Sequence, residues 1–247
     1  MLLTRHTKGV FWRQNGVYHV CNGSRRLHAP NAGKILDFTQ TSEFLAAAGA
    51  IPSIPKSSGL PEIIVTGRAN VGKSTLLNAI VQRSSNKLMN TSSKAGHTKT
   101  LNFFSVGASP GKLILVDAPG YGSRGRPEWG DLFDHYVQSR EHLKRAYILF
   151  NAKHGLNGHD IRMLSHLSQL LMNERGEQRF TLQAVVTKAD TVPVAELQSA
   201  IAKIKEDIWK AAPLCLAPIV TSAGMAPPFG IQTLRQNIAG ACGLSSN

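Results

Sequence analysis

Gly67, Gly72, Lys73 and Ser74 have the types and the spacing of a phosphate-binding loop, in the segment G-R-A-N-V-G-K-S. An apolar β-branched run precedes the segment and an amphipathic run follows it, so the order is strand, loop, helix. Backbone N–H groups of such a loop converge on an anion, a lysine reaches the outer phosphates, and a hydroxyl can ligate phosphate-bound Mg²⁺. We therefore expect a nucleoside triphosphate to bind at Gly67, Arg68, Ala69, Asn70, Val71, Gly72, Lys73, Ser74 and Thr75.

A second segment, Asp117-Ala118-Pro119-Gly120, follows the apolar run 112–117. An aspartate at the end of a neighbouring strand can hold Mg²⁺ through a water molecule. The glycine lets a backbone N–H approach the γ-phosphate, because it has no side chain to obstruct it. These residues are the expected D-x-x-G switch of the site.

Two further segments predict that the base is guanine. Thr187-Lys188-Ala189-Asp190 ends the apolar run 182–187, and Thr221-Ser222-Ala223 ends the run 216–220. The Asp190 carboxylate can accept two hydrogen bonds, from N1–H and the exocyclic amine of guanine, a donor pair that adenine lacks. Lys188 can lie along the base with its aliphatic stem, and the backbone amides of residues 221–223 could bind the guanine O6. GTP and GDP are therefore the expected ligands.

A first switch is expected between these segments, at Lys94, Ala95, Gly96, His97 and Thr98. One threonine here should complete the Mg²⁺ shell when GTP is bound and release it after hydrolysis. Thr98 is the predicted ligand and Thr100 the alternative. The predicted metal ligands are Ser74, Thr98 and, through water, Asp117, and the predicted catalytic residues are Lys73, Thr98 and Gly120.

Slow intrinsic hydrolysis is expected, because Tyr121 follows the D-x-x-G segment where Ras-like enzymes have the glutamine that orients water. A partner or a monovalent cation would then supply the missing group. Arg124 and Arg126 could act as internal arginine fingers, or could contact a partner or solvent, in a loop that Gly122 and Gly125 make mobile.

Alternating apolar runs and amphipathic segments predict an α/β fold of the P-loop NTPase (Ras-like G domain) class. We expect a six-stranded, mostly parallel sheet with helices on both faces, and nucleotide at the carboxyl ends of the strands. The five-residue link 107–111 predicts an antiparallel hairpin at one edge. Strands are expected near 62–67, 101–106, 112–117, 145–151, 182–187 and 216–221, and helices near 41–48, 73–83, 128–143, 158–173, 193–211 and 231–241.

The segments G-R-A-N-V-G-K-S-T-L-L-N, A-G-H-T-K-T-L-N-F-F, D-A-P-G-Y-G and T-K-A-D resemble those of EngB-type (YihA/YsxC) GTPases of the TRAFAC class, over about residues 40–243. The resemblance implies a small single-domain GTPase that acts in assembly of the large ribosomal subunit. Asn70 is similar to the asparagine of cation-stimulated members, which implies possible stimulation by K⁺. The chain departs from the family at Asn151 and Lys153, where an aspartate and an arginine are usual.

Charge is unevenly distributed in this chain of formal net charge +13. Residues 63–116 carry seven Lys or Arg and no acid, and Arg83, Lys87, Lys94 and Lys99 extend beyond the expected phosphate contacts. A surface of this kind suits RNA, with affinity that falls as salt rises; solvated side chains without a partner are the alternative. Ribosomal RNA or the large subunit is the expected partner of a monomeric protein.

Residues 1–36 carry six Lys or Arg and no acid, a composition typical of a mitochondrial transit peptide. We expect a leader at 1–36, a helix and extended strap at 37–61, the G domain at 62–243 and a short tail at 244–247, in the mitochondrial matrix. A basic tail that contacts RNA is the alternative for the first segment. No apolar stretch approaches the roughly 20 residues that span a bilayer.

Two classes of function remain open. The first is a GTPase that binds the large ribosomal subunit in its GTP form and leaves after hydrolysis. The second is a switch at a membrane surface whose effector is a protein, without ribosome or RNA contact. Salt-sensitive, GTP-dependent binding to ribosomal RNA would distinguish the first from the second.

Overall fold

The computed structural model describes residues 38, 42–81, 100–122 and 127–244. The chain separates into two units, 1–32 and 33–247, and every described residue belongs to the second. Its sheet has seven strands in the order β1-β3-β4-β2-β5-β6-β7. The strands are β1 (Ser42–Ala48), β2 (Glu62–Gly67), β3 (Leu101–Val106), β4 (Leu113–Asp117), β5 (Leu143–Asn151), β6 (Thr181–Thr187) and β7 (Leu216–Val220).

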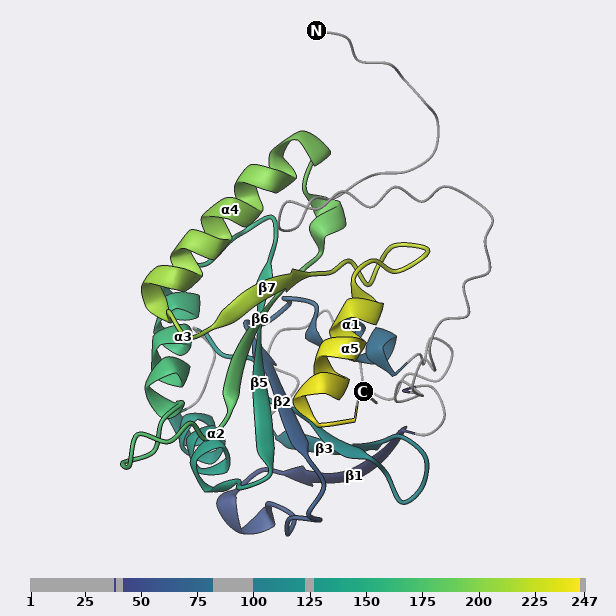
Figure 1. Cartoon of the computed structure of the whole chain (residues 1–247), viewed down its shortest axis with the longest axis vertical. Coiled ribbons are helices and arrows are strands. Elements are labelled where there is room, and N and C mark those ends of the chain that lie inside the picture. Colours follow the sequence, from purple (N-terminus) through teal and green to yellow (C-terminus); the bar gives the residue numbers. More distant parts are fainter. Residues whose placement is uncertain (1–37, 39–41, 82–99, 123–126, 245–247) are drawn as a thin grey trace, which may run out of the picture. The chain divides into compact units, whose positions relative to one another are not determined.

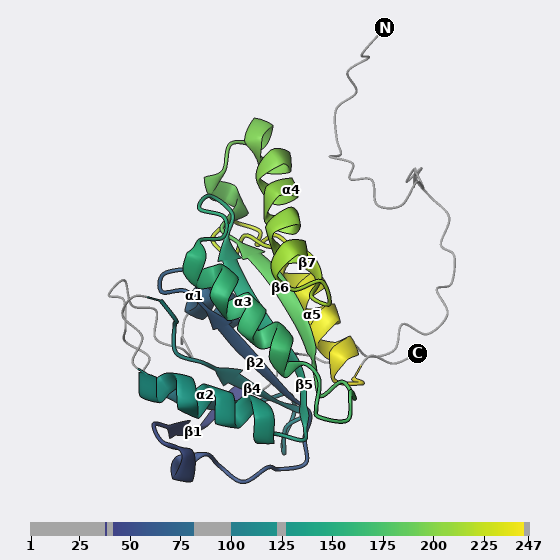
Figure 2. The same cartoon turned by 90° about the vertical axis from the view of Figure 1, so that its left-hand side faces the viewer.

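Within the described residues, five α-helices cover both faces of this sheet (Figures 1 and 2). They are α1 (Lys73–Ile80), α2 (Pro127–Ser139), α3 (Gly158–Leu170), α4 (Val194–Ala211) and α5 (Ile231–Ala241). Helices α2, α3 and α4 lie on one face, and α1 and α5 on the other (Figure 1). Because both faces are covered, the central strands must be apolar along their whole length, and every residue of β2 and β4 is buried.

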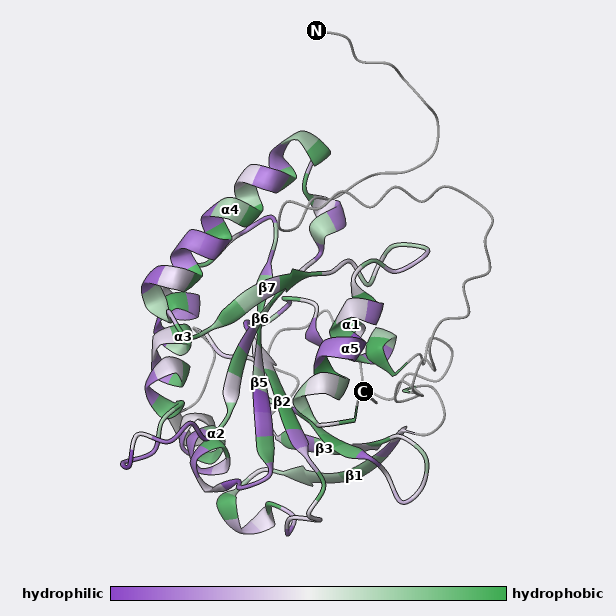
Figure 3. Cartoon of the chain, viewed as in Figure 1, coloured by the Kyte–Doolittle hydropathy of each residue, from purple (hydrophilic) through white to green (hydrophobic). Residues whose placement is uncertain are grey.

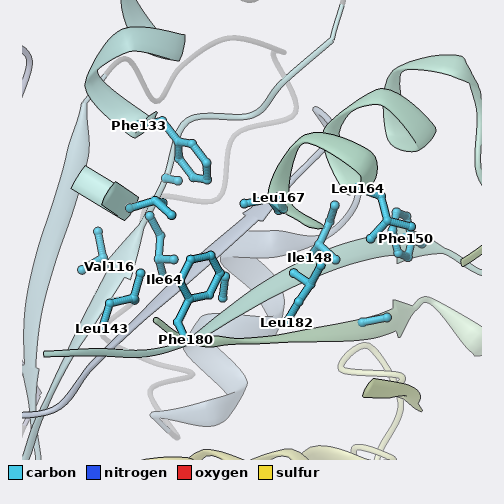
Figure 4. Close-up of a cluster of buried hydrophobic side chains, with 14 of the residues drawn as sticks. Ile64, Val116, Phe133, Leu143, Ile148, Phe150, Leu164, Leu167, Phe180 and Leu182 are labelled. Atoms are coloured by element: carbon cyan, nitrogen blue, oxygen red, sulfur yellow. The ribbon is translucent and has the colours of Figure 1, made fainter. Parts of the chain in front are cut away.

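Each face of the sheet has its own hydrophobic core. The core under α2, α3 and α4 is the larger, and ten of its residues are labelled in Figure 4: Ile64, Val116, Phe133, Leu143, Ile148, Phe150, Leu164, Leu167, Phe180 and Leu182. The core under α1 and α5 contains Leu77, Val65 and Leu234. In Figure 3 hydrophobic and hydrophilic residues alternate along the helices, and β7 is mainly hydrophobic. The two cores pack against the strands and so fix the strand ends from which the loops of the site extend.

The prediction of a helix at 41–48 is wrong. These residues form β1, which pairs antiparallel with β3 and adds a seventh strand to the predicted six. Alanine is the strongest helix former, but β3 would otherwise present an unpaired edge, and pairing with it satisfies the backbone of β1. The Phe44 ring also packs on Phe104, with 5.6 Å between ring centroids. The hairpin of β3 and β4 is antiparallel as predicted, but β1, not β3, is the edge strand.

The mostly parallel sheet is confirmed, and the other predicted strands and helices are present, but the helix predicted at 128–143 ends at Ser139 and β5 begins at Leu143. β2 pairs parallel with β4 and β5, and β5-β6 and β6-β7 are also parallel. The strap is a 3-10 turn at Ile51–Ser53 followed by irregular chain to residue 61. Among the described helices, none combines the length and the hydropathy that a membrane span requires.

Candidate functional site

The phosphate-binding loop connects the end of β2 to the start of α1. Gly72 has a φ of 100° and Asn70 a φ of 62°, conformations that favour glycine and, among other residues, asparagine. A β-carbon on Gly67 would lie 2.8 Å from the Val71 side chain, so the tight turn requires glycine there. The loop thereby directs the N-terminus of α1, with its free N–H groups, to the place where an anion binds.

Lys73 and Asp117 meet at the base of this loop. The Lys73 Nζ donates a hydrogen bond to Asp117 Oδ1, and the two residues are only 9% and 3% exposed. Burial raises the pKa of Asp117, and the Lys73 charge opposes that shift. Ser74, in the first turn of α1, is half-buried. A hydroxyl and a carboxylate are oxygen ligands that Mg²⁺ accepts, so Ser74 and Asp117 fit the predicted ion.

The D-x-x-G segment packs directly against the phosphate-binding loop. The Ala118 N–H donates to the Val65 carbonyl at 3.0 Å, and the Tyr121 N–H donates to the Gly67 carbonyl at 3.3 Å. A β-carbon on Gly120 would lie 3.3 Å from the Ala69 nitrogen. The two segments, about fifty residues apart in the chain, are therefore adjacent in space because β2 and β4 are neighbouring parallel strands.

The segment at 187–190 reaches the same loop from the other side. Lys188, with a φ of 56°, donates from Nζ to the Asn70 carbonyl at 2.9 Å. The Thr187 hydroxyl lies 2.6 Å from the Val71 carbonyl oxygen. The aliphatic stem of Lys188 passes Gly72, where a β-carbon would lie 3.3 Å from its Cε. Lys188 thus stabilises the loop as well as offering a surface for the base.

The guanine-recognition segments lie side by side. The Ser222 hydroxyl donates to Asp190 Oδ1, and the Ala189 N–H donates to the Thr221 carbonyl at 3.2 Å. Two of the three amides proposed for O6 have partners in the fold: the Thr221 N–H donates to Val186 and the Ser222 N–H to Phe229. Binding of the guanine O6 by a backbone amide of residues 221–223 stays a prediction, and Ala223 is the member of the three whose N–H takes part in neither of these two bonds.

Several expected site residues lie outside the described part of the chain: Lys94, Ala95, Gly96, His97, Thr98, Arg124 and Arg126. Thr98 as a metal ligand thus stays a prediction. Its alternative, Thr100, is described, and its hydroxyl donates to Asn102 Oδ1 at 2.8 Å. That bond ties Thr100 to the start of β3.

Sequence reasoning left Asn151 without a role, and the structure assigns one. Its side-chain oxygen accepts hydrogen bonds from the N–H groups of Lys153, at 2.9 Å, and His154, at 3.3 Å. Asn151 therefore closes the turn after β5, beside the phosphate-binding loop. A cavity of about 460 Å³ lies there, lined by Arg68, Ala69, Asn70, Val71, Asn151, His154 and Lys188.

Sequence reasoning also gave no role to Asp160 and named Arg68 only as part of the loop. The structure brings Arg68 to a buried Asp160 in the first turn of α3. A signal was present in the sequence: Asn157 and Asp160 have the spacing of a helix-capping pair. That pattern predicts the helix start but not the contacts of Asp160 with the site.

Comparisons with known proteins agree with this site. A family described as "50S ribosome-binding GTPase" matches residues 62–188. A probable GTP-binding protein EngB of Hyphomonas neptunium is 32% identical over 216 residues, 85% of this chain and 92% of that protein. Its counterpart in Bradyrhizobium diazoefficiens is 39% identical over 186 residues, 72% of this chain and 79% of that protein.

Solved structures share the fold. A crystal structure of a probable GTP-binding protein engB has a TM-score of 0.51 at 20% identity, covering 73% of this chain and 98% of that one. Era in complex with MgGDPNP and nucleotides 1506–1542 of 16S ribosomal RNA has a TM-score of 0.53 at 22% identity, covering 74% of this chain and 56% of that one.

Proposed function

This chain belongs to the EngB family of GTP-binding proteins and is a GTPase; from that premise we propose that it acts as a switch in assembly of the mitochondrial large ribosomal subunit or in mitochondrial translation. One observation supports the nucleotide-dependent switch in this proposal. Lys73, Asp117 and Lys188 meet at one phosphate-binding loop. A site that contacts the triphosphate and the base through separate loops can adopt different conformations with GTP and with GDP.

Each group of residues in the site has its own proposed role. Lys73 and the amides of the loop would hold the phosphates, Ser74, Thr98 and, through water, Asp117 would hold Mg²⁺, and Asp190 and Ala223 would bind the guanine. Mg²⁺, when bound, neutralises charge on the β- and γ-phosphates. Gly120 brings its N–H to the γ-phosphate. Tyr121 in place of a water-orienting glutamine makes hydrolysis slow until a partner or a cation assists.

Two features support the ribosome as a partner: the positive charge of the chain and the family to which it belongs. The matching family is described as ribosome-binding, and the acid-free stretch 63–116 suits phosphate-rich RNA. The mitochondrial matrix as location rests on the acid-free, basic composition of residues 1–36. Co-sedimentation with ribosomal subunits tests the first of these two proposals.

K⁺ is the cation we propose to assist hydrolysis. Asn70 is exposed at the tip of the loop and has a positive φ, so its side chain is free to reach a cation beside the phosphates. We expect faster GTP turnover in KCl than in NaCl at equal ionic strength, with little change for Asn70→Ala between the two salts. Equal turnover of the unaltered protein in both salts would refute the proposal.

Co-sedimentation with ribosomal subunits tests the function. The full chain, loaded with a non-hydrolysable GTP analogue or with GDP, is centrifuged with mitochondrial large and small subunits. We expect binding to the large subunit with the analogue alone. Lys73→Ala, which removes the phosphate contact, serves as the nucleotide-free control and should not bind. Absence of binding in both nucleotide states would refute the ribosomal role and favour a protein effector.

A further inference from the structure

A buried carboxylate joins three parts of the site. Asp160, in the first turn of α3, is 1% exposed. Its Oδ1 accepts a hydrogen bond from the Tyr121 hydroxyl at 2.9 Å. Its Oδ2 lies 3.4 Å from Arg68 Nη1 and accepts from the Asn157 N–H at 2.9 Å. The phosphate-binding loop, the residue after D-x-x-G and α3 therefore meet at one side chain.

Helix capping alone does not account for this arrangement. Asp160 and Asn157 form a capping box, which needs one carboxylate oxygen and tolerates full exposure to solvent. Here the carboxylate is buried, and burial of a charge is costly unless other groups compensate it. Arg68 and Tyr121 supply that compensation, and both come from the nucleotide site rather than from the helix.

The Tyr121 hydroxyl stays protonated and donates its hydrogen bond to Asp160. Burial and the neighbouring Asp160 charge raise the pKa of Tyr121 well above its ordinary value, so the hydroxyl keeps its proton at physiological pH. Two cavities, of about 240 and 230 Å³, have Tyr121 and Gly122 in their walls. The ring also packs against the larger core, so the bond to Asp160 adds a specific restraint on the hydroxyl to the packing of the ring.

The backbone at Tyr121 is hydrogen-bonded to the phosphate-binding loop, so the position of the Tyr121 side chain affects the site. The Tyr121 N–H donates to the Gly67 carbonyl, and residues 68 and 121 form a parallel bridge. A β-carbon on Gly122 would lie 3.7 Å from Cγ of Arg68, so the chain runs along the arginine. Gly120, whose N–H is expected at the γ-phosphate, is the residue directly before this clamp.

We propose that Asp160 is a positioning residue for GTP hydrolysis, which holds Tyr121 and Arg68 and thereby fixes the Gly120 backbone against the phosphate-binding loop. A displacement of about 1 Å in a catalytic group can cost two orders of magnitude in rate. The loss of Asp160 therefore slows the chemical step. It leaves nucleotide affinity unchanged, because neither Asp160 nor the Tyr121 hydroxyl is among the groups that hold the phosphates or the base. The proposal requires the GTPase activity but not the ribosomal role.

The test is single-turnover GTP hydrolysis by the full chain and its variants. Tyr121→Phe removes only the hydroxyl, and one hydrogen bond corresponds to a fall of about fivefold in kcat. The Kd values for GTP and GDP should stay within about twofold, which is the precision of such a comparison. Asp160→Ala, which removes both carboxylate oxygens, should slow turnover at least as much, and the double variant should be no slower than Asp160→Ala, because both changes break the contact between Tyr121 and Asp160.

Asn157→Ala is the matched control. It removes the side chain that caps α3 and accepts from the N–H groups of His159 and Asp160, but it leaves the carboxylate in place. We expect a lower Tm and unchanged kcat, which separates positioning from helix stability. If Asp160→Ala does not fold, the kcat of Tyr121→Phe alone tests the proposal.

Three results would overturn the proposal: an unchanged kcat in Tyr121→Phe, a parallel loss of nucleotide affinity, or losses that multiply in the double variant. GTP binding without turnover in the unaltered chain would instead overturn the GTPase assignment. The two failures are therefore distinguishable.

Discussion

At the scale of single residues, Asp190 shows how the fold prepares a side chain for its ligand. The Ser222 hydroxyl donates to one carboxylate oxygen of Asp190, while the other lies near Gly224, where a β-carbon would be 4.0 Å away. Gly224 thus leaves space beside Asp190. The carboxylate is held in place without a ligand, which would reduce the entropy lost when the predicted guanine binds.

We expect Asp190→Asn to exchange guanine for xanthine specificity. An amide cannot accept from both N1–H and the exocyclic amine, and hydrogen bonds to a charged group contribute about 1.5–3 kcal/mol each. GTP affinity should fall by about a hundredfold, and xanthosine triphosphate should become the preferred ligand. Competition against a fluorescent guanine nucleotide measures both.

The control for this exchange is Asp207→Asn on α4, which alters the same residue type away from the site. It should leave both affinities unchanged. If Asp190→Asn bound GTP as tightly as the unaltered chain does, the assignment of the base to Asp190 would be wrong.

At the scale of elements, a buried ion pair fixes the helix after the second switch to the sheet. Glu62, at the start of β2, is fully buried and accepts from the Tyr136 hydroxyl at 2.6 Å and from Arg140 Nε at 2.9 Å. Arg140 also lies over the rings of Phe103 and Tyr136. Helix α2 is thus joined at its C-terminal end to β2, the strand that leads into the phosphate-binding loop.

Arg140→Ala should reduce the free energy of unfolding by about 3 kcal/mol, because it leaves the Glu62 charge buried and unpaired. Urea denaturation measures the change. Adding Glu62→Gln should restore part of the loss, since a neutral amide is cheaper to bury.

Lys210→Ala is the comparison for this loss, because it removes an exposed partner of Glu206 on α4. Exposed pairs contribute little, so stability should barely change. A loss in Arg140→Ala no larger than in Lys210→Ala would show that the buried pair is unimportant.

At the scale of the whole molecule, the excess of positive charge is concentrated rather than uniform. Arg83, Lys87, Lys94 and Lys99 lie outside the described residues, but they follow α1 directly or precede β3 in the chain. The phosphate-binding loop and the first switch are thus bordered by basic residues in sequence. If the chain binds RNA as we propose, a charge distribution of this kind would place the RNA contact next to the predicted first switch.

RNA affinity should therefore fall steeply with salt. Replacing Arg83 and Lys87 together by alanine should reduce the slope of log K against log salt by about 1.5, at about 0.7–0.9 for each phosphate contact. Titration of large-subunit ribosomal RNA between low and physiological salt measures the slope. Lys203 and Lys205, exposed on α4, are the matched control pair. A slope that is flat in the unaltered chain would contradict RNA binding.

The nucleotide site could be predicted from sequence because its signals are local. The loop at 67–74 and the D-x-x-G segment each follow an apolar strand, and in a parallel sheet those strand ends lie at one edge. The same holds for the guanine segments at 187–190 and 221–223. Residue type, spacing and the preceding strand were therefore sufficient to predict a GTPase and most elements of the fold, whereas the roles of the individual site residues stay predictions.

Only the tertiary structure decided the features that depend on distant partners. Residues 42–48 have helical propensity, yet the open edge of β3 makes them a strand, since pairing satisfies both backbones. Asp160 has the local pattern of a helix cap, yet burial against Arg68 and Tyr121 gives it contacts with the site. Local propensities amount to tenths of a kcal/mol per residue, whereas edge pairing and compensation of a buried charge amount to several. The larger, non-local terms therefore prevailed.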